Sequence, residues 1–446
     1  MHRAAVIRPP GTHRAARAHM GNARPSSTEV AFIKLAILLS TGAFDVVLIT
    51  DQDSSGTGNP LLQAAWAGIA LVSFILLFRE RRSAKTWLSD WVLWAFVFVP
   101  LLSTLWSIDH LVTLRRSLNL AATVALGLYI GLRYPLRVQL RILSSVLSIA
   151  AFASIAAVIL LPDVGIMQDI GVEGAWRGIF PHRNALGQMM VLNCLALLSL
   201  YSGRRKTFAV YGTLLLSVAL ILFSGSRSAL ALLLVILSAA YMFRGGIKRI
   251  RKWVLIFATL LVISVLAHVE LDDVFALIGR DATLTGRTDL WAAVGMMILR
   301  APLLGHGYAA FWTESNPDRD VIWKFVGWQP NHSHNGFLEV LLGVGAIGLL
   351  VLLCTLGAMF VRAWKHFEIR RNSVAAFPLL FLLAMVISNL DETNFLQSNN
   401  IFTILTIAVA TSIHLYRHSR KRPAFVTPRK DAAMGRGTSH GIAGAD

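Results

Sequence analysis

The stretch ALALLLVILSAAYMF, residues 229–243, contains no charged residue and decides the fold class. A run of this kind, extended through its flanks, suits a transmembrane α-helix, which takes about 17 to 25 residues to cross a bilayer. The other spanning structure, a closed β-barrel, is built from short strands in which apolar and polar residues alternate, and this run does not alternate. Because backbone groups in lipid must be hydrogen-bonded within the protein, we predict an all-α structure.

Comparable runs recur between residues 31 and 416 of the 446-residue chain. Hydrophobic residues make up 55% of the chain and charged residues 15%, and the mean hydropathy is +0.60. These values do not describe a soluble domain. The pattern predicts a polytopic membrane protein with about twelve transmembrane helices. The predicted spans are 31–50, 61–78, 88–106, 118–132, 142–161, 184–201, 208–223, 228–243, 253–268, 335–360, 376–390 and 400–416.

The positive residues indicate the orientation of these helices, because Lys and Arg accumulate in cytoplasmic loops. If the N-terminus is cytoplasmic, 31 of the 42 Lys and Arg residues fall in inward segments. Both termini are therefore predicted to be cytoplasmic, with basic tails over 1–30 and 417–446 flanking a membrane domain over 31–416. Topology, with some attraction to anionic lipid, explains most of the net charge of +18, and no nucleic-acid partner is expected.

The N-terminal tail is rich in Arg and Pro and is followed by a full apolar span, so it is not expected to be a cleaved signal peptide. Met20 is an alternative start of the chain. The two cysteines, Cys194 and Cys354, lie within apolar runs and are expected to pack in the core rather than to form a disulfide framework.

One outward loop is far longer than the others. It runs from about 269 to 334 and holds the motifs DATLTGRTDLW (281–291) and PLLGHGYAAFW (302–312). Loops of such length without structure of their own are usually functional. The loop ends in NHSHN (331–335), hereafter the NHSHN segment, directly before a predicted span. A strongly polar segment therefore meets the membrane at this point.

Ten Lys and Arg residues face outward in this topology, and nine of them are arginine. Three belong to conspicuous motifs: Arg183 begins a predicted helix, Arg227 joins two of them, and Arg287 lies in the large loop. Guanidinium groups grip phosphate with two parallel hydrogen bonds, so the cluster indicates an anionic ligand at the outer membrane face, and a pyrophosphate on a long-chain lipid carrier fits. The alternative is that each arginine extends to the interface or pairs with a local carboxylate. The full set is Arg115, Arg116, Arg177, Arg183, Arg227, Arg280, Arg287, Arg300, Arg319 and Lys324.

Five motifs along the chain carry a resemblance to a known family. In their order and topology they are similar to the O-antigen ligase and polysaccharide polymerase superfamily, and within it to the exopolysaccharide production proteins that polymerise succinoglycan-type repeat units. The similarity spans roughly residues 100 to 405. The motifs are TLWSIDHLVTLRRS (104–117), GIFPHRNALG (178–187), SGSRSALALLL (224–234), GRTDLW (286–291) with PLLGHGYAAFW, and NHSHNGFLEVLLGVGAIGLL (331–350).

The resemblance implies a membrane glycosyltransferase of the multi-helix, GT-C-like type in the bacterial inner membrane, with its active site on the periplasmic face. Such enzymes invert the anomeric centre without a metal or other cofactor, and move a sugar chain from undecaprenyl pyrophosphate to an acceptor hydroxyl. By motif, His334 corresponds to the family's essential histidine, and Arg183, Arg227 and Arg287 correspond to positions associated with the donor pyrophosphate. The implied partners are a lipid-linked glycan donor and acceptor, membrane lipid, and chain-length regulator and export proteins.

The residues suit this chemistry on physical grounds as well. Departure of a pyrophosphate builds negative charge, and two unit charges 4 Å apart interact by about 4 kcal/mol at an effective dielectric near 20, so one or two arginines can supply much of the stabilisation. The attacking hydroxyl must lose its proton, which a neutral histidine accepts for a factor of about 10² to 10⁴. His334 is the candidate base. On a helix His332 would point elsewhere, so we expect it to contact substrate or to support the structure.

Further polar residues are candidate substrate contacts. Glu339 follows Asn335 by one helical turn, and it either orients the site or is a hydrogen-bonded buried carboxylate. Asp391 and Glu392 face outward, and they either contact the acceptor or cap their loop. Five outward tryptophans either stack on sugar rings or anchor the protein at the interface. The predicted substrate-binding set is Arg115, Arg116, Arg177, His332, Asn335, Glu339 and Glu392, and the tryptophans are Trp176, Trp291, Trp312, Trp323 and Trp328.

Several other functions compete with this interpretation. A zinc site built from His306, His332 and His334 is disfavoured by the spacing of the histidines, and a two-carboxylate glycosidase is disfavoured because the outward residues are mainly cationic. A transporter such as a lipid-linked oligosaccharide flippase would place charged residues along a path through the middle of the membrane. It is disfavoured because the predicted spans are nearly free of charge in their middles. Among periplasmic transferases, a polymerase extends glycans on the carrier and a ligase hands them to lipid A core. The motifs favour the polymerase and leave the ligase open.

Overall fold

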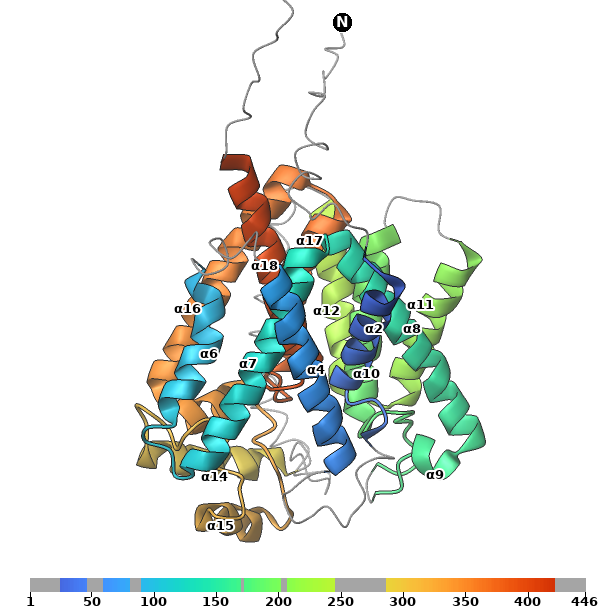
Figure 1. Ribbon diagram of the computed structural model, residues 1–446. Coiled ribbons are helices and arrows are strands. Elements are labelled where there is room, and N and C mark those ends of the chain that lie inside the picture. The colour runs from blue at the N-terminus through green and yellow to red at the C-terminus, as the bar shows by residue number, and fades with distance from the viewer. Residues whose placement is uncertain are drawn as a thin grey trace, which may run out of the picture.

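The computed structural model describes residues 25–45, 59–80, 90–169, 172–201, 207–244 and 286–421 (Figure 1). Within these ranges the chain forms helices, and extended pairing is limited to one isolated bridge. The predicted all-α class is confirmed for this part of the chain. The helices are α2 (Ser27–Ser40), α4 (Pro60–Arg79), α6 (Trp91–Ser103), α7 (His110–Arg133), α8 (Leu136–Leu160), α9 (Pro162–Gly165), α10 (Arg183–Tyr201), α11 (Phe208–Phe223), α12 (Arg227–Arg244), α14 (Arg287–Arg300), α15 (Pro317–Val326), α16 (Gly336–Arg370), α17 (Ser373–Ser388) and α18 (Ile401–Lys421).

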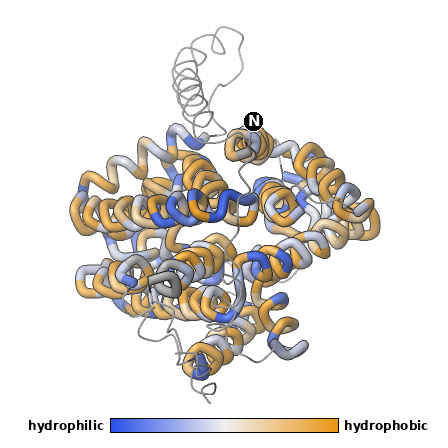
Figure 2. The backbone as a smooth tube through the Cα atoms, turned by 90° about the horizontal axis from the view of Figure 1, so that it is seen from above, coloured by the Kyte–Doolittle hydropathy of each residue, from blue (hydrophilic) through white to orange (hydrophobic). Residues whose placement is uncertain are grey.

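Each predicted span that falls wholly or partly in the described ranges overlaps one of these helices, whereas span 253–268, Arg280 and most of both basic tails lie outside the described residues. Among the described residues four helices, α4, α8, α10 and α16, are long and apolar enough to cross a membrane. Five shorter apolar helices accompany them within α6, α11, α12, α17 and α18. The apolar character runs along most helices of the bundle (Figure 2).

The outer surface of the bundle is rich in exposed apolar side chains. Phe208 is 93% exposed, and Leu61 and Phe78 are also exposed on helices that are almost wholly apolar. Exposure of this much apolar surface to water is unfavourable, whereas lipid tails solvate it readily. The chain is therefore an integral membrane protein.

Two glycines allow a close helix contact in the middle of the bundle. Helices α7 and α18 pack against each other along their lengths. An added Cβ at Gly127 would lie 2.7 Å from the carbonyl oxygen of Ile404, and one at Gly131 would lie 2.6 Å from Cβ of Thr411. Small residues four apart are the usual means by which membrane helices approach each other closely. This contact fixes α18, and with it the connection that precedes α18.

The bundle has two unlike ends. Helices α14 and α15 lie together at one end, at the bottom of Figure 1, while α18 finishes at the opposite end, at the top. We call the end that holds α14 and α15 the loop end. The described part of the large loop, 286–334, is not structureless as the sequence suggested, because it forms these two helices and packs them on a small core of its own around Leu290, Phe311 and Ile322.

Helix α16 is kinked near the loop end, and the kink explains the GHG sequence of the large loop. Gly345 has a φ of 67°, outside the helical region, which frees the carbonyl groups of the preceding turn. Two of these are taken up by loop amides: His306 donates to Leu342 at 2.9 Å and Gly307 donates to Gly343 at 2.9 Å. Broken helices are tolerated at membrane depth only where such partners exist. The loop is therefore bonded to the helix that follows the NHSHN segment.

Candidate functional site

The NHSHN segment is held in place by the start of α16 and by the α17–α18 connection, residues 389–400. Asn335 caps α16, since its Oδ1 accepts hydrogen bonds from two amides of the first turn at 3.0 and 3.2 Å. The amide of Gly336 donates to the carbonyl oxygens of Asn389 and Glu392, at 2.8 and 3.1 Å. Two segments that are distant in sequence are thereby joined through their backbones.

The two histidines of this segment lie against each other. The rings of His332 and His334 have centroids 4.0 Å apart and planes inclined by 51°. The expectation that His332 would point elsewhere was wrong, because the segment is not helical: His334 has a φ of 49°, and its amide donates to Nδ1 of His332 at 3.1 Å. Burial, assisted by the neighbouring His334, lowers the pKa of His332 to about 4, so His332 is neutral at physiological pH.

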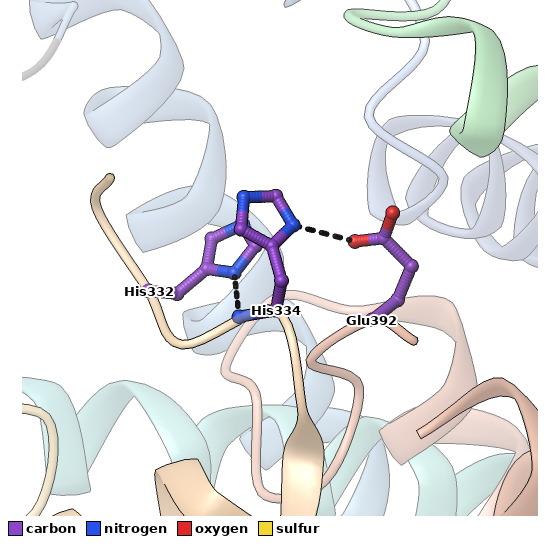
Figure 3. A group of neighbouring side chains, drawn as sticks. All are labelled: His332, His334 and Glu392. Atoms are coloured by element: carbon purple, nitrogen blue, oxygen red, sulfur yellow. Dashed lines mark hydrogen bonds and ion pairs between the residues drawn. The ribbon is translucent and has the colours of Figure 1, made fainter. Parts of the chain in front are cut away.

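Glu392 faces His334 from the α17–α18 connection (Figure 3). Its Oε2 lies 3.5 Å from Nδ1 of His334, and its Oε1 accepts a hydrogen bond from the side-chain amide of Asn184 at 2.8 Å. Burial by itself raises the pKa of this carboxyl, but the nearby His334, His332 and Arg287 outweigh burial and hold the pKa at about 2. The carboxylate is therefore ionised beside the histidine at every physiological pH.

Arg287, the first residue of α14, is bound to two carboxylates. Its NH1 donates to both the side chain and the backbone carbonyl of Asp391, and its NH2 lies 3.4 Å from Oε1 of Glu392. The sequence had associated Arg287 with the donor pyrophosphate. In the structure its charge is matched by Asp391 and Glu392, which is the alternative that the sequence left open for each outward arginine. Arg287 thereby ties α14 to the connection that carries Glu392.

Arg183 and Arg227 are placed differently. They begin α10 and α12, and they lie close enough for their charges to interact. Arg183 donates to the carbonyl oxygen of Gly225 at 3.3 Å, while its Nε is buried and has no hydrogen-bond partner among the described residues. In the described part of the chain neither guanidinium has a carboxylate within 4.0 Å. Two neighbouring cations at helix N-termini, without counter-charge, form a site that favours an anion.

Glu339 lies in the first turn of α16, as expected, and it holds the large loop. Its two carboxylate oxygens accept from Nε1 of Trp312 at 3.1 and 3.2 Å. One of them also accepts from the amide of Ser333 at 2.8 Å. Ser333 stands between the two histidines, so Glu339 fixes the position of the NHSHN segment. Of the two roles left open for Glu339, these contacts favour orienting the site.

The remaining candidate arginines lie elsewhere. Arg116 donates to the carbonyl oxygen of Ala309 and joins α7 to the large loop. Arg177 donates to the carbonyl oxygens of Val164 and Asp163 at 2.9 and 3.1 Å, and closes the segment after α8. The side chain of Arg115 is exposed. Within the described ranges no hydrogen bond or ion pair joins these three arginines to the histidines. Arg116 nevertheless lies close enough to Glu339 for their charges to interact.

One group of side chains in the described ranges could hold a metal ion. Ligand atoms of His332, His334 and Glu392 all lie within 4.8 Å of one another. Nδ1 of His332 already accepts a backbone hydrogen bond, which leaves its Nε2 as a ligand, and a cation would compete with Arg287 for Glu392. His306, the third histidine of the zinc trio weighed from the sequence, is not part of this group, and its Nε2 lies 3.0 Å from the carbonyl oxygen of Met297.

Two residues near His334, Asn184 and His182, were missed by the sequence analysis, and a third, Trp328, was named there only among the outward tryptophans. Asn184 binds Glu392, as described, and its amide lies 3.3 Å from Nδ1 of His182. His182 is close enough to Glu392 and His334 for their charges to interact. The ring of Trp328 lies 5.7 Å from that of His334. A signal existed for the first two, since His182 and Asn184 flank Arg183 at the start of an apolar helix, but only the arginine was singled out.

Comparison with known proteins places part of the chain in a family context. Residues 212–353 match a family model described as "O-Antigen ligase". The resemblance to the O-antigen ligase superfamily is confirmed. The matched range contains Arg227, Arg287, both histidines of the NHSHN segment and Glu339, while Arg183 and Glu392 lie outside it. The site described above thus joins the family segment to segments on either side of it: Arg183 on α10 and Glu392 on the α17–α18 connection.

Two relatives are similar over shorter stretches. The chain is 34% identical over 98 residues to the "Exopolysaccharide production protein ExoQ" of Rhizobium meliloti (strain 1021), over 21% of this chain and 22% of that protein. It is 26% identical over 117 residues to the "Putative polysaccharide ligase" of Rickettsia felis (strain ATCC VR-1525 / URRWXCal2), over 25% of this chain and 29% of that protein. The chain therefore aligns with less than a third of the length of either relative.

Proposed function

We propose that this protein polymerises exopolysaccharide at the periplasmic face of the bacterial inner membrane. It transfers a growing glycan from undecaprenyl pyrophosphate to a hydroxyl of a second carrier-linked repeat unit, with inversion at the anomeric carbon. About twelve transmembrane helices carry the site, both termini are cytoplasmic, and the loop end faces the periplasm. The proposal is supported by the family match, by the similarity to ExoQ and by the arrangement of basic residues along the chain.

One observation carries the proposal: a histidine paired with a carboxylate lies near two arginines that have no carboxylate partner among the described residues. His334 faces Glu392 at 3.5 Å, and His182, which interacts electrostatically with both, directly precedes Arg183. A proton acceptor and an anion site are the two requirements for glycosyl transfer from a pyrophosphate. Arg183 in turn interacts with Arg227. The proposed base, His334, and the anion site therefore lie at the same end of the bundle.

His334 acts as the general base. A proton on its Nδ1 faces Glu392, which leaves Nε2 free to take the proton of the attacking hydroxyl. The ionised carboxylate stabilises the imidazolium that forms, as the acid does in other carboxylate–histidine pairs. The contact of 3.5 Å is long for a hydrogen bond, and such contacts often tighten only when substrate binds.

Arg183 and Arg227 hold the pyrophosphate. Their mutual repulsion is relieved when the anion binds, and it is relieved further as negative charge develops on the leaving group. Arg287 keeps Glu392 in place, and its two carboxylate partners favour this role over that of a pyrophosphate ligand. The mechanism needs no metal, since the positive charge that assists departure comes from arginine side chains.

The alternative within the same chemistry is a ligase that transfers the lipid-linked glycan to lipid A core. The relative from Rickettsia felis, with its ligase name, favours keeping this candidate. A lipid-linked oligosaccharide flippase is the remaining alternative from another class.

The decisive test uses purified protein in liposomes, a synthetic undecaprenyl-pyrophosphate-linked repeat unit, no lipid A and an excess of chelator. A ladder of longer carrier-linked glycans is expected, and His334→Ala with unchanged thermal stability should give none. Transfer only after lipid A core is added would instead identify a ligase. If neither acceptor supports transfer, the transferase proposal fails.

A further inference from the structure

A groove lies beside the NHSHN segment at the loop end, and neither the mechanism nor the family match assigns it a role. It has a volume of about 520 Å³. Its walls come from α15 and the turn that follows. We call it the Trp323 groove; the residues that line it are Arg319, Asp320, Trp323, Lys324, Gly327, Trp328 and Gln329.

We propose that the Trp323 groove binds a sugar ring of the acceptor glycan and holds the acceptor hydroxyl toward His334. This inference rests on the proposed function, because it assumes that the acceptor is a saccharide. It goes beyond that function by assigning the acceptor a binding site on α15, apart from the arginines that hold the donor pyrophosphate.

The groove is connected directly to the proposed base. Trp328 is a wall of the groove, and its ring lies 5.7 Å from that of His334. Nε1 of Trp323 donates to the carbonyl oxygen of Pro330 at 2.8 Å, directly before the NHSHN segment. A ring seated between the two tryptophans would therefore lie beside the segment that carries the base.

The lining has the chemistry of a saccharide site. Indole rings offer broad apolar faces with negative potential, against which the C–H face of a sugar ring packs. Arg319 is already oriented, since its guanidinium stacks on Trp323 at 4.0 Å and NH2 lies 2.9 Å from Oδ1 of Asp320. In the described chain NH1 of Arg319 and Oδ2 of Asp320 keep unused hydrogen-bonding capacity. A hydrogen-bond donor and a hydrogen-bond acceptor that lie side by side can bind two neighbouring hydroxyl groups of a sugar.

The composition of the groove also separates a saccharide from other occupants. A lipid chain would be bound by apolar side chains, yet four of the seven lining residues carry a charge or an amide: Arg319, Asp320, Lys324 and Gln329. Both donors and acceptors are present among them, which a neutral polyhydroxyl ligand uses better than a simple anion does. The combination of polar groups and aromatic faces therefore fits a sugar better than it fits a lipid chain or a simple anion.

Binding can be measured without catalysis. The probe is the oligosaccharide repeat unit released from the producing bacterium's own exopolysaccharide, free of lipid and phosphate, and the observable is saturation-transfer-difference NMR on the full-length protein in nanodiscs. We expect binding by the wild type and roughly tenfold weaker binding by Trp323→Ala. Trp323→Phe, which keeps an aromatic face but lacks the bond to Pro330, should retain most of the affinity. Trp364→Ala, on α16 at the opposite end, is the matched control and should bind as the wild type does.

The outcomes distinguish this inference from the proposed function. Absence of binding by the wild type, or undiminished binding by Trp323→Ala, would overturn the saccharide site even if polymerisation is observed. His334→Ala should bind the oligosaccharide normally while transferring nothing. If the wild type transfers no glycan but binds the oligosaccharide in a Trp323-dependent way, the proposed function fails and the saccharide site remains. In transfer assays, Trp323→Ala should raise KM for a soluble acceptor about tenfold and change kcat little.

Discussion

Glu392 and His334 face each other at 3.5 Å although they stand on different elements, the first on the α17–α18 connection and the second before α16. The relationship is maintained by backbone bonds from Gly336 to Asn389 and Glu392. Side-chain contacts to Asn184 and Arg287 hold the carboxylate from two further helices. The pair is thus held by α10, α14, the start of α16 and the α17–α18 connection, an arrangement suited to positioning a reactive ring.

Replacing Glu392 by Gln should lower kcat for transfer by about 10² or more, because the imidazolium loses its counter-charge and the preferred tautomer of His334 is no longer enforced. Donor binding should change little. Initial rates with the carrier-linked repeat unit would measure kcat, and binding of a non-transferable analogue would measure donor affinity. A wild-type kcat in a folded Glu392→Gln protein would contradict the proposed pairing.

Arg227→Met and Arg287→Met should behave in opposite ways. Loss of Arg227 removes one of two repelling cations, so thermal stability should be unchanged or higher, while transfer falls by about 10² because leaving-group stabilisation is lost. Loss of Arg287 leaves Asp391 and Glu392 without their partner, which should destabilise the fold by roughly 3 kcal/mol. Thermal unfolding and initial rates, measured on both variants, test the assignment. A destabilised Arg227→Met would argue that this arginine is structural.

Acid should destabilise the protein through His332. Its pKa in the folded protein is about 4, against 6.5 for an ordinary histidine. The unfolded chain therefore binds the proton first, and stability falls as pH drops from about 6.5 toward 4. Glu392, with its lowered pKa, loses its contribution only as pH falls from the ordinary 4.5 toward about 2. Melting temperatures between pH 7 and 5 should fall less steeply in His332→Asn than in the wild type; equal slopes would count against a neutral His332.

Gly345→Ala should disrupt the kink of α16. Gly345 has positive φ, and an added Cβ would collide with the carbonyl group of Leu303. We expect a loss of more than about 2 kcal/mol and a displaced NHSHN segment. Gly357, on the same helix, has nothing within 4 Å of an added Cβ, so Gly357→Ala is the control and should be neutral or slightly stabilising. Thermal unfolding of the two variants should differ clearly; similar values would mean that the kink is not required.

Much of the fold was predictable because membrane helices are determined locally. Runs such as 208–223 satisfy their own backbone hydrogen bonds, so hydropathy alone located them, and α11 coincides with its predicted span. The structure of the large loop was not predictable in the same way. Helices α14 and α15 are short and have mixed composition, and they are stabilised by packing on residues such as Phe311 and Leu342 rather than by an apolar run.

By itself the sequence determined the helical class, the positions of the apolar helices, and the motifs that contain Arg183, Arg227 and the NHSHN segment, because these depend on composition and on neighbouring residues. Only the tertiary structure decided how the site residues are used. It pairs Arg287 with Asp391 and Glu392, gives Arg183 and Arg227 no carboxylate partner in the described part of the chain, and turns His332 onto His334. The physical reason is that charge matching depends on distances between segments far apart in the chain, which local patterns do not specify.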